Sequence, residues 1–159
     1  MGAAPLDLAA AYAYARIGDS PRDRLDRIKQ LAQLKPHDEE SGVARATAAL
    51  DAHEFGVARH ALQPFLKDKL TRRVARLMAR LEAEENGDAG RAREWIARAA
   101  TAARDPVWTA DGVILDAWSP VSPVTGALDA VAWRSPVSGP ECDEASLAAD
   151  LKDLLAGDA

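Results

Sequence analysis

Two short segments in the C-terminal third of the chain carry residues at the spacing of a metal knuckle, in which two ligands three positions apart precede a glycine. Gly112 and Gly126 occupy the glycine positions. Zinc binds thiolate, imidazole or carboxylate, and neutral hydroxyls are poor ligands, so we predict that these knuckles hold no metal. The four ligand positions hold Trp108, Asp111, Ser122 and Thr125.

The other residues that could act as nucleophiles or bases are scattered along the chain. His37, His53 and His60 fall in different predicted segments, and the single cysteine, Cys142, lies beside acidic residues that disfavour a thiolate. The serines lack a nucleophile elbow or a paired base, and no G-x-G-x-x-G fingerprint is present. We therefore predict no enzymatic activity and no cofactor.

Helical periodicity extends to about residue 103 and predicts five or six helices. The second begins after Ser20, a suitable N-cap that is followed by Pro21, and the fifth closes near Gly87. The predicted helices cover about residues 5–17, 21–35, 39–52, 56–66, 70–86 and 89–103.

The turns between these helices recur at a fixed interval. Three of them begin at residues 18, 53 and 87, and intervals of 35 and 34 residues match the tetratricopeptide period. We predict an all-α fold, a tetratricopeptide-like α-solenoid of about three helical hairpins, with three unrelated hairpins in a generic α-bundle as the alternative. Small residues fall where paired helices would touch, at Ala11, Ala46, Ala58, Ala92 and Ala99.

Such a stack would present a concave groove lined by the first helix of each hairpin. Arg72, Arg76 and Arg80 recur every four residues and predict a basic ridge that binds carboxylates of a partner peptide. A solvated face, with Glu84 and Glu85 pairing locally, is the alternative. The predicted groove residues are Tyr12, Arg16, Thr47, Asp51, Arg73, Arg76 and Arg80.

The amino-acid composition changes after residue 105, since five of the nine prolines and three of the four tryptophans lie in residues 106–140. Extended pieces around two turns predict a degenerate, metal-free rubredoxin-like knuckle module there. An irregular extension that covers the end of the helical stack is the alternative. Residues 141–159 predict a short acidic, amphipathic helix that docks on residues 1–105 or stays loosely held.

Composition and charge exclude several classes of protein. The 159-residue chain holds 35 alanines and only 5% aromatic residues, which argues against an all-β fold. Its net charge of −5 divides into +2 for residues 1–105 and −7 for residues 106–159. Neither part has the basic stripe with interleaved aromatics that binds nucleic acid, and no apolar run approaches the roughly 20 residues that span a bilayer.

Three runs carry a resemblance to a known family. The runs "RDPVWTADG" at 104–112, "WSPVSPVTG" at 118–126 and "TRRVARLMARLEAEENGDAGRAREWIARA" at 71–99 resemble the C-terminal part of HemY-like tetratricopeptide proteins of proteobacteria. The resemblance covers about residues 6–135. It implies that the chain is the soluble, cytoplasmic C-terminal region of a longer inner-membrane protein with a hydrophobic N-terminal hairpin.

The resemblance also implies a function. Such a protein would be a protein–protein interaction scaffold associated with haem (porphyrin) biosynthesis, with pathway enzymes among its partners and no catalysis of its own. The knuckles without cysteine depart from relatives in which the cysteines are intact. A haem or porphyrin carrier that uses Tyr12, Trp95 or a histidine is the alternative function.

Overall fold

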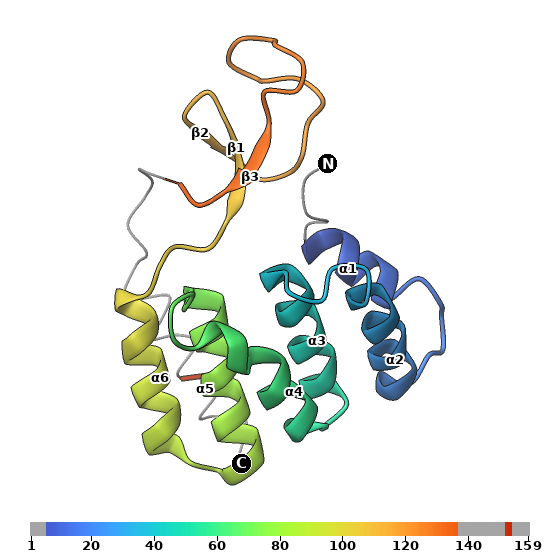
Figure 1. Ribbon diagram of the computed structural model, residues 1–159, viewed down its shortest axis with the longest axis vertical. Helices are drawn as coiled ribbons and strands as arrows, with labels where there is room; N and C mark the ends of the chain where they lie inside the picture. Colours follow the sequence, from blue (N-terminus) through green and yellow to red (C-terminus); the bar gives the residue numbers. More distant parts are fainter. Residues whose placement is uncertain (1–5, 137–151, 154–159) are drawn as a thin grey trace.

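Six helices precede a small sheet in the computed structural model, which describes residues 6–136 and 152–153 (Figure 1). The helices are α1 (Leu6–Ala13), α2 (Pro21–Ala32), α3 (Glu39–Asp51), α4 (Phe55–Leu62), α5 (Arg72–Asn86) and α6 (Ala89–Thr101), with a 3-10 turn, η1 (Gln63–Phe65), after α4. The strands are β1 (Val107–Ala110), β2 (Val113–Leu115) and β3 (Ala132–Arg134). The tail helix predicted for 141–159 lies outside the described residues, apart from 152–153.

The fold is mixed α/β, so the predicted all-α tetratricopeptide-like solenoid is wrong. β1 pairs antiparallel with both β2 and β3, which gives the strand order β2-β1-β3. Asp111 and Gly112 both adopt left-handed backbone conformations in the turn that joins β1 to β2. Helical periodicity in the first two thirds of the chain dominated the prediction. It carried no information on β3, which pairs with a strand far back along the chain.

The helix boundaries follow local sequence signals. The Ser20 hydroxyl accepts a hydrogen bond from Asp23 N, and the Asp23 carboxylate accepts one from Ser20 N, so the predicted N-cap of α2 is confirmed as a capping box. Gly87 ends α5 in a left-handed conformation with φ 61°. α1 ends at Ala13, earlier than predicted, and Pro64 lies in the 3-10 turn after α4.

Each helix packs on the next one, and α3 also contacts α1 and α5. Four of the five alanines predicted at helix contacts lie in the core: Ala46, Ala58, Ala92 and Ala99 are fully buried, whereas Ala11 is exposed. Small side chains let helix backbones approach closely, and leucines such as Leu50 fill the space between them. No helix among the described residues has both the length and the apolar character that crossing a membrane requires.

A polar junction around Arg73 fixes the sheet to the helices. The Arg73 guanidinium bonds Glu39 Oε1 at 2.9 Å and Glu40 Oε1 at 2.6 Å, and Arg73 N donates to Asp105 Oδ1 at 2.9 Å. The indole Nε1 of Trp133, on β3, donates to Glu40 Oε1 at 3.0 Å. The sheet is therefore tied to α3 and α5 through one buried carboxylate.

Candidate functional site

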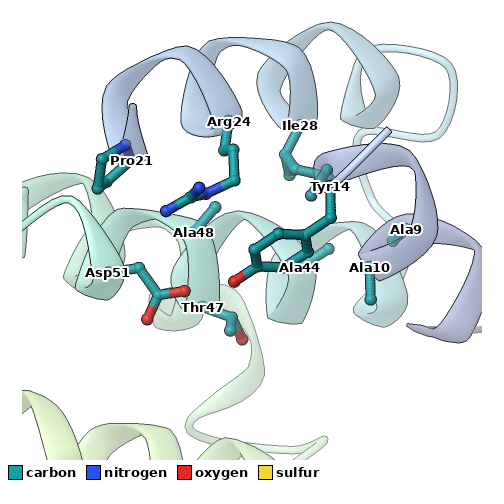
Figure 2. Close-up of a pocket in the computed structure, with 11 residues that line it drawn as sticks. Ala9, Ala10, Tyr14, Pro21, Arg24, Ile28, Ala44, Thr47, Ala48 and Asp51 are labelled. Atoms are coloured by element: carbon teal, nitrogen blue, oxygen red, sulfur yellow. The ribbon is translucent and has the colours of Figure 1, made fainter. Parts of the chain in front are cut away.

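An open apolar depression lies between α1, α2 and α3 and has a volume of about 100 Å³; we call it the α1–α3 groove (Figure 2). Its floor is made mainly of alanines, because α1 and α3 are both rich in this residue. A second depression of about 120 Å³ adjoins it and shares Ala9, Ile28 and Ala44. The groove is lined by Ala9, Ala10, Ala13, Tyr14, Pro21, Arg24, Ile28, Ala44, Thr47, Ala48 and Asp51.

Arg24 and Asp51 bring charge to this apolar surface. Figure 2 shows the Arg24 side chain extending from α2 toward α3, where Asp51 and Thr47 lie. The Arg24 guanidinium lies 4.9 Å from the centre of the Tyr14 ring and donates to the Asp19 carbonyl at 3.0 Å. Within the described part of the chain, no carboxylate lies within ion-pair distance of Arg24, so its charge is available at the groove.

Asp51 is held by a cation from another helix. Its Oδ1 accepts a hydrogen bond from Arg80 Nη2 at 3.0 Å, and Arg80 also bonds Glu84 at 2.6 Å. Burial alone would lower the pKa of Arg80, but its bonds to Glu84 and Asp51 outweigh burial and raise the pKa above its ordinary value. The Thr47 hydroxyl donates to the Val43 carbonyl at 2.9 Å. The groove therefore suits binding of apolar groups and one anion.

The structure places the predicted groove residues in separate surroundings. Thr47 and Asp51 line the α1–α3 groove, Tyr12 is partly exposed on α1, and Arg16 is exposed beyond the end of α1. Arg73 and Arg80 bind carboxylates of the chain itself, and Arg76 is not free either.

Burial alone would lower the pKa of Arg73, whereas its hydrogen bonds and charge attraction to Glu40 and Glu39 outweigh burial and raise that pKa. Glu39 and Glu40 lie 34 and 33 residues before Arg73, so its partners depend on the packing of α3 against α5.

Arg24 and Tyr14 were missed by the sequence reasoning. The spacing in the sequence does place Arg24 beside Ile28 on one face of α2, because the two residues are four positions apart. The groove could not be located, however, because α1 was predicted to continue through Tyr14 to residue 17.

The structure brings three of the four knuckle positions together. Asp111 Oδ2 accepts hydrogen bonds from the Ser122 hydroxyl at 2.5 Å and from the Thr125 hydroxyl at 2.8 Å. These two hydroxyls lower the pKa of Asp111 below its ordinary value. Trp108 instead packs edge-to-face on Trp133, with ring centres 5.1 Å apart. A hydrogen-bonded cluster of Asp111, Ser122 and Thr125 thus joins the two turns.

No group of three or more His, Cys, Asp and Glu side chains in residues 6–136 and 152–153 is placed to hold a metal ion. His37, His53 and His60 are exposed, and none of them lines the α1–α3 groove. Cys142 lies outside the described residues.

Comparison with known proteins finds a similarity to part of a longer protein. The chain is 29% identical over 120 residues to a protein of Magnetospirillum gryphiswaldense described as "Probable magnetosome protein Mms48". The match covers 74% of this chain and 27% of that protein, so the chain spans about a quarter of the curated relative. No protein-family model matches the chain, and no solved structure matches it.

These comparisons overturn the family predicted from the sequence. The resemblance to HemY-like tetratricopeptide proteins is wrong, because no such family model matches the chain and the similar protein is described as a probable magnetosome protein. The link to haem biosynthesis, which rested on that resemblance alone, is withdrawn with it. Generic repeat residues and two short proline-containing runs are too little sequence to identify a family.

Proposed function

We propose that this chain is a protein-interaction module without catalytic activity, and that its α1–α3 groove receives a segment of a partner protein. The observation that carries the proposal is an open, alanine-floored groove with a guanidinium at its edge that forms no ion pair with a described carboxylate. Alanine side chains are short, so the floor leaves room for larger apolar side chains of a partner. No nucleic acid is expected as a partner.

The chemistry of the groove defines the segment that would bind. Apolar side chains would cover Ala9, Ala44 and Ile28, and a carboxylate of the partner would meet Arg24 by a charge-assisted hydrogen bond. A cation of the partner would be attracted less strongly to Asp51, because the Asp51 carboxylate already accepts a hydrogen bond from Arg80. The expected ligand is therefore an apolar segment that carries an aspartate or glutamate.

The similarity to the longer relative supports the idea of a module. A stretch of 120 residues is shared with a protein of which it forms about a quarter, as expected for a unit used within longer chains. The description of the relative makes magnetosome proteins the first partners to test. Attachment of a longer form of this chain to the inner membrane stays a prediction, which fractionation of cells carrying the tagged full-length protein tests.

The alternative of a haem or porphyrin carrier has no observation in its favour. Tyr12 lies on α1, and Trp95 lies on α6 beneath the guanidinium of Arg98, 4.1 Å from it. Neither residue lines the α1–α3 groove, and the exposed histidines do not line it either. The residues named for this function therefore do not converge on a common site.

A peptide selection tests the groove. Peptides selected from a random display library on the immobilised chain should combine apolar residues with a carboxylate, and a selected peptide should shift backbone NMR signals of residues 9–14, 24–28 and 44–51. Arg24→Glu should weaken its affinity at least about tenfold, whereas Arg93→Glu, at an exposed position on α6, should not.

A second pair of variants tests shape instead of charge. Ala10 is exposed and lines the groove, so Ala10→Trp should fill it and abolish binding, while Ala97→Trp on the exposed side of α6 should leave binding unchanged. Circular dichroism establishes that all four variants fold. Equal binding by Arg24→Glu and Arg93→Glu, or NMR signal shifts outside the groove, would show that the α1–α3 groove is not the binding site.

A further inference from the structure

The small sheet lies at the end of the molecule away from α4 (Figure 1), and several large apolar side chains of β2 and of the loop after it are exposed. The sixteen-residue segment 113–128, which comprises β2 and most of the loop after it, carries six exposed large apolar side chains. Val113 is 45% exposed, Trp118 59%, Val124 57% and Leu128 74%. We call this set, with Val121, the β2 apolar surface; Ile114 is also exposed, but on the opposite face of the strand. Several large exposed apolar side chains in one short segment mark an interaction site more often than scattered single ones do.

β2 is also an edge strand. β1 pairs with it on one side, and no described strand pairs with its other side. Its sequence, Val113-Ile114-Leu115, is apolar throughout, and residues 111–118 contain no lysine and no proline. Lysine and proline are among the residues by which natural edge strands prevent pairing with other chains. β2 therefore presents unpaired backbone groups without these protections.

The loop after β2 is ordered by its own hydrogen bonds. Val121 and Leu128 form an antiparallel bridge, and Ser122 N donates to the Ala127 carbonyl at 2.9 Å. The bond from the Ser122 hydroxyl to Asp111 then ties this loop to the turn before β2. The loop that carries the other exposed apolar side chains is therefore fixed relative to β2.

The charge around this surface selects the kind of partner. Residues 106–136 contain three aspartates, Asp111, Asp116 and Asp129, and a single basic residue, Arg134. All three aspartates are exposed, and none has an ion pair with a described residue. Residues 137–159 contain six acidic residues and one lysine, so like charge disfavours this segment as the occupant. A second copy would bring the same three aspartates and is disfavoured for the same reason.

We propose that β2 binds an extended, basic segment of a partner protein, which adds to the sheet as a fourth strand. Backbone hydrogen bonds to β2 would provide affinity, as in other cases of strand addition. Apolar side chains of the segment would pack on Val113, Trp118 and Leu128. Asp111 lies in the turn before β2 and Asp116 directly follows the strand, so cations near both ends of the segment would be attracted. This surface is separate from the α1–α3 groove.

Synthetic peptides test the proposal directly. The probe is a capped six-residue peptide in which valine and threonine alternate between two terminal lysines. One control peptide has glutamate at both ends. The other is the lysine peptide N-methylated on alternate backbone nitrogens. The lysine peptide should bind saturably and broaden or shift NMR signals of residues 113–118. The other two peptides should bind at least about tenfold more weakly.

Variants of the chain separate charge from packing. Asp116→Lys should weaken the lysine peptide and strengthen the glutamate peptide, and Trp118→Ser should weaken both. Asp68→Lys changes an exposed aspartate elsewhere and should change neither. Binding that is insensitive to N-methylation would overturn strand addition. A dimer in light scattering that Trp118→Ser dissolves would identify a second copy as the occupant, and co-sedimentation with phosphatidylcholine vesicles that Trp118→Ser abolishes would identify a membrane.

Discussion

Trp133 donates its indole N–H to Glu40 at 3.0 Å, although 93 positions separate the two residues. The same Glu40 oxygen accepts a bond from Arg73, and Glu40 is buried. Because a buried carboxylate requires compensating donors, the position of the sheet and the pairing of α3 with α5 depend on each other. The helical part and the sheet are thus coupled by one side chain.

Trp133→Phe should loosen the sheet more than the helices. The substitution keeps an aromatic ring against Trp108 but removes the N–H, and a hydrogen bond to a charged group contributes about 1.5–3 kcal/mol. Hydrogen exchange should show faster exchange of β1 amides with α3 less affected. Trp118→Phe is the control, because Trp118 is exposed. Equal protection of β1 in both variants would show that the indole bond does not hold the sheet.

Arg73→Met should lower the free energy of unfolding by about 3–5 kcal/mol, because it leaves the carboxylates of Glu39 and Glu40 partly buried without their cation. Urea denaturation followed by circular dichroism measures the change. Arg93→Met, at an exposed site, should change it by less than about 0.5 kcal/mol. A loss of under 1 kcal/mol for Arg73→Met would contradict the role given to this junction.

Asp111 should titrate below the ordinary range of aspartate. Since its pKa is lowered in the folded state, the bonds from Ser122 and Thr125 contribute stability that is fully present above the unfolded value of about 4 and is lost as pH falls through the folded pKa. NMR titration should show a higher Asp111 pKa in Ser122→Ala than in the unaltered chain. Ser119→Ala, whose hydroxyl bonds the Val121 carbonyl instead, should leave it unchanged.

Gly42 should tolerate no larger residue. A Cβ at this position in α3 would overlap Cε2 of the buried Phe65 ring and lie 3.2 Å from the Ala61 carbonyl oxygen, so Gly42→Ala should cost about 1–3 kcal/mol. Gly56→Ala in α4 meets no atom within 4 Å and should stabilise the chain by up to about 1 kcal/mol. Thermal unfolding of the two variants measures both effects, and equal melting temperatures would contradict the packing described for Phe65.

Features that depend on neighbours in the chain followed from the sequence alone. Ser20 and Pro21 start α2, Gly87 ends α5, and the Asp111-Gly112 turn joins two strands, because a cap or a left-handed conformation is satisfied within a few residues. The end of α1 was predicted too late, since helical propensity continues past Ala13 and no breaker stands before Gly18.

Features that depend on distant partners were decided only by the tertiary structure. The sequence showed arginines at helical spacing, but the packing of α5 on α3 determined that Arg73 and Arg80 bind carboxylates of the chain itself. It also showed Asp111, Ser122 and Thr125 at knuckle spacing, and the tertiary fold brought them within hydrogen-bond distance. The groove at Arg24 and the strand order β2-β1-β3 arise in the same way, because burial and charge pairing are set by segments that meet only after folding.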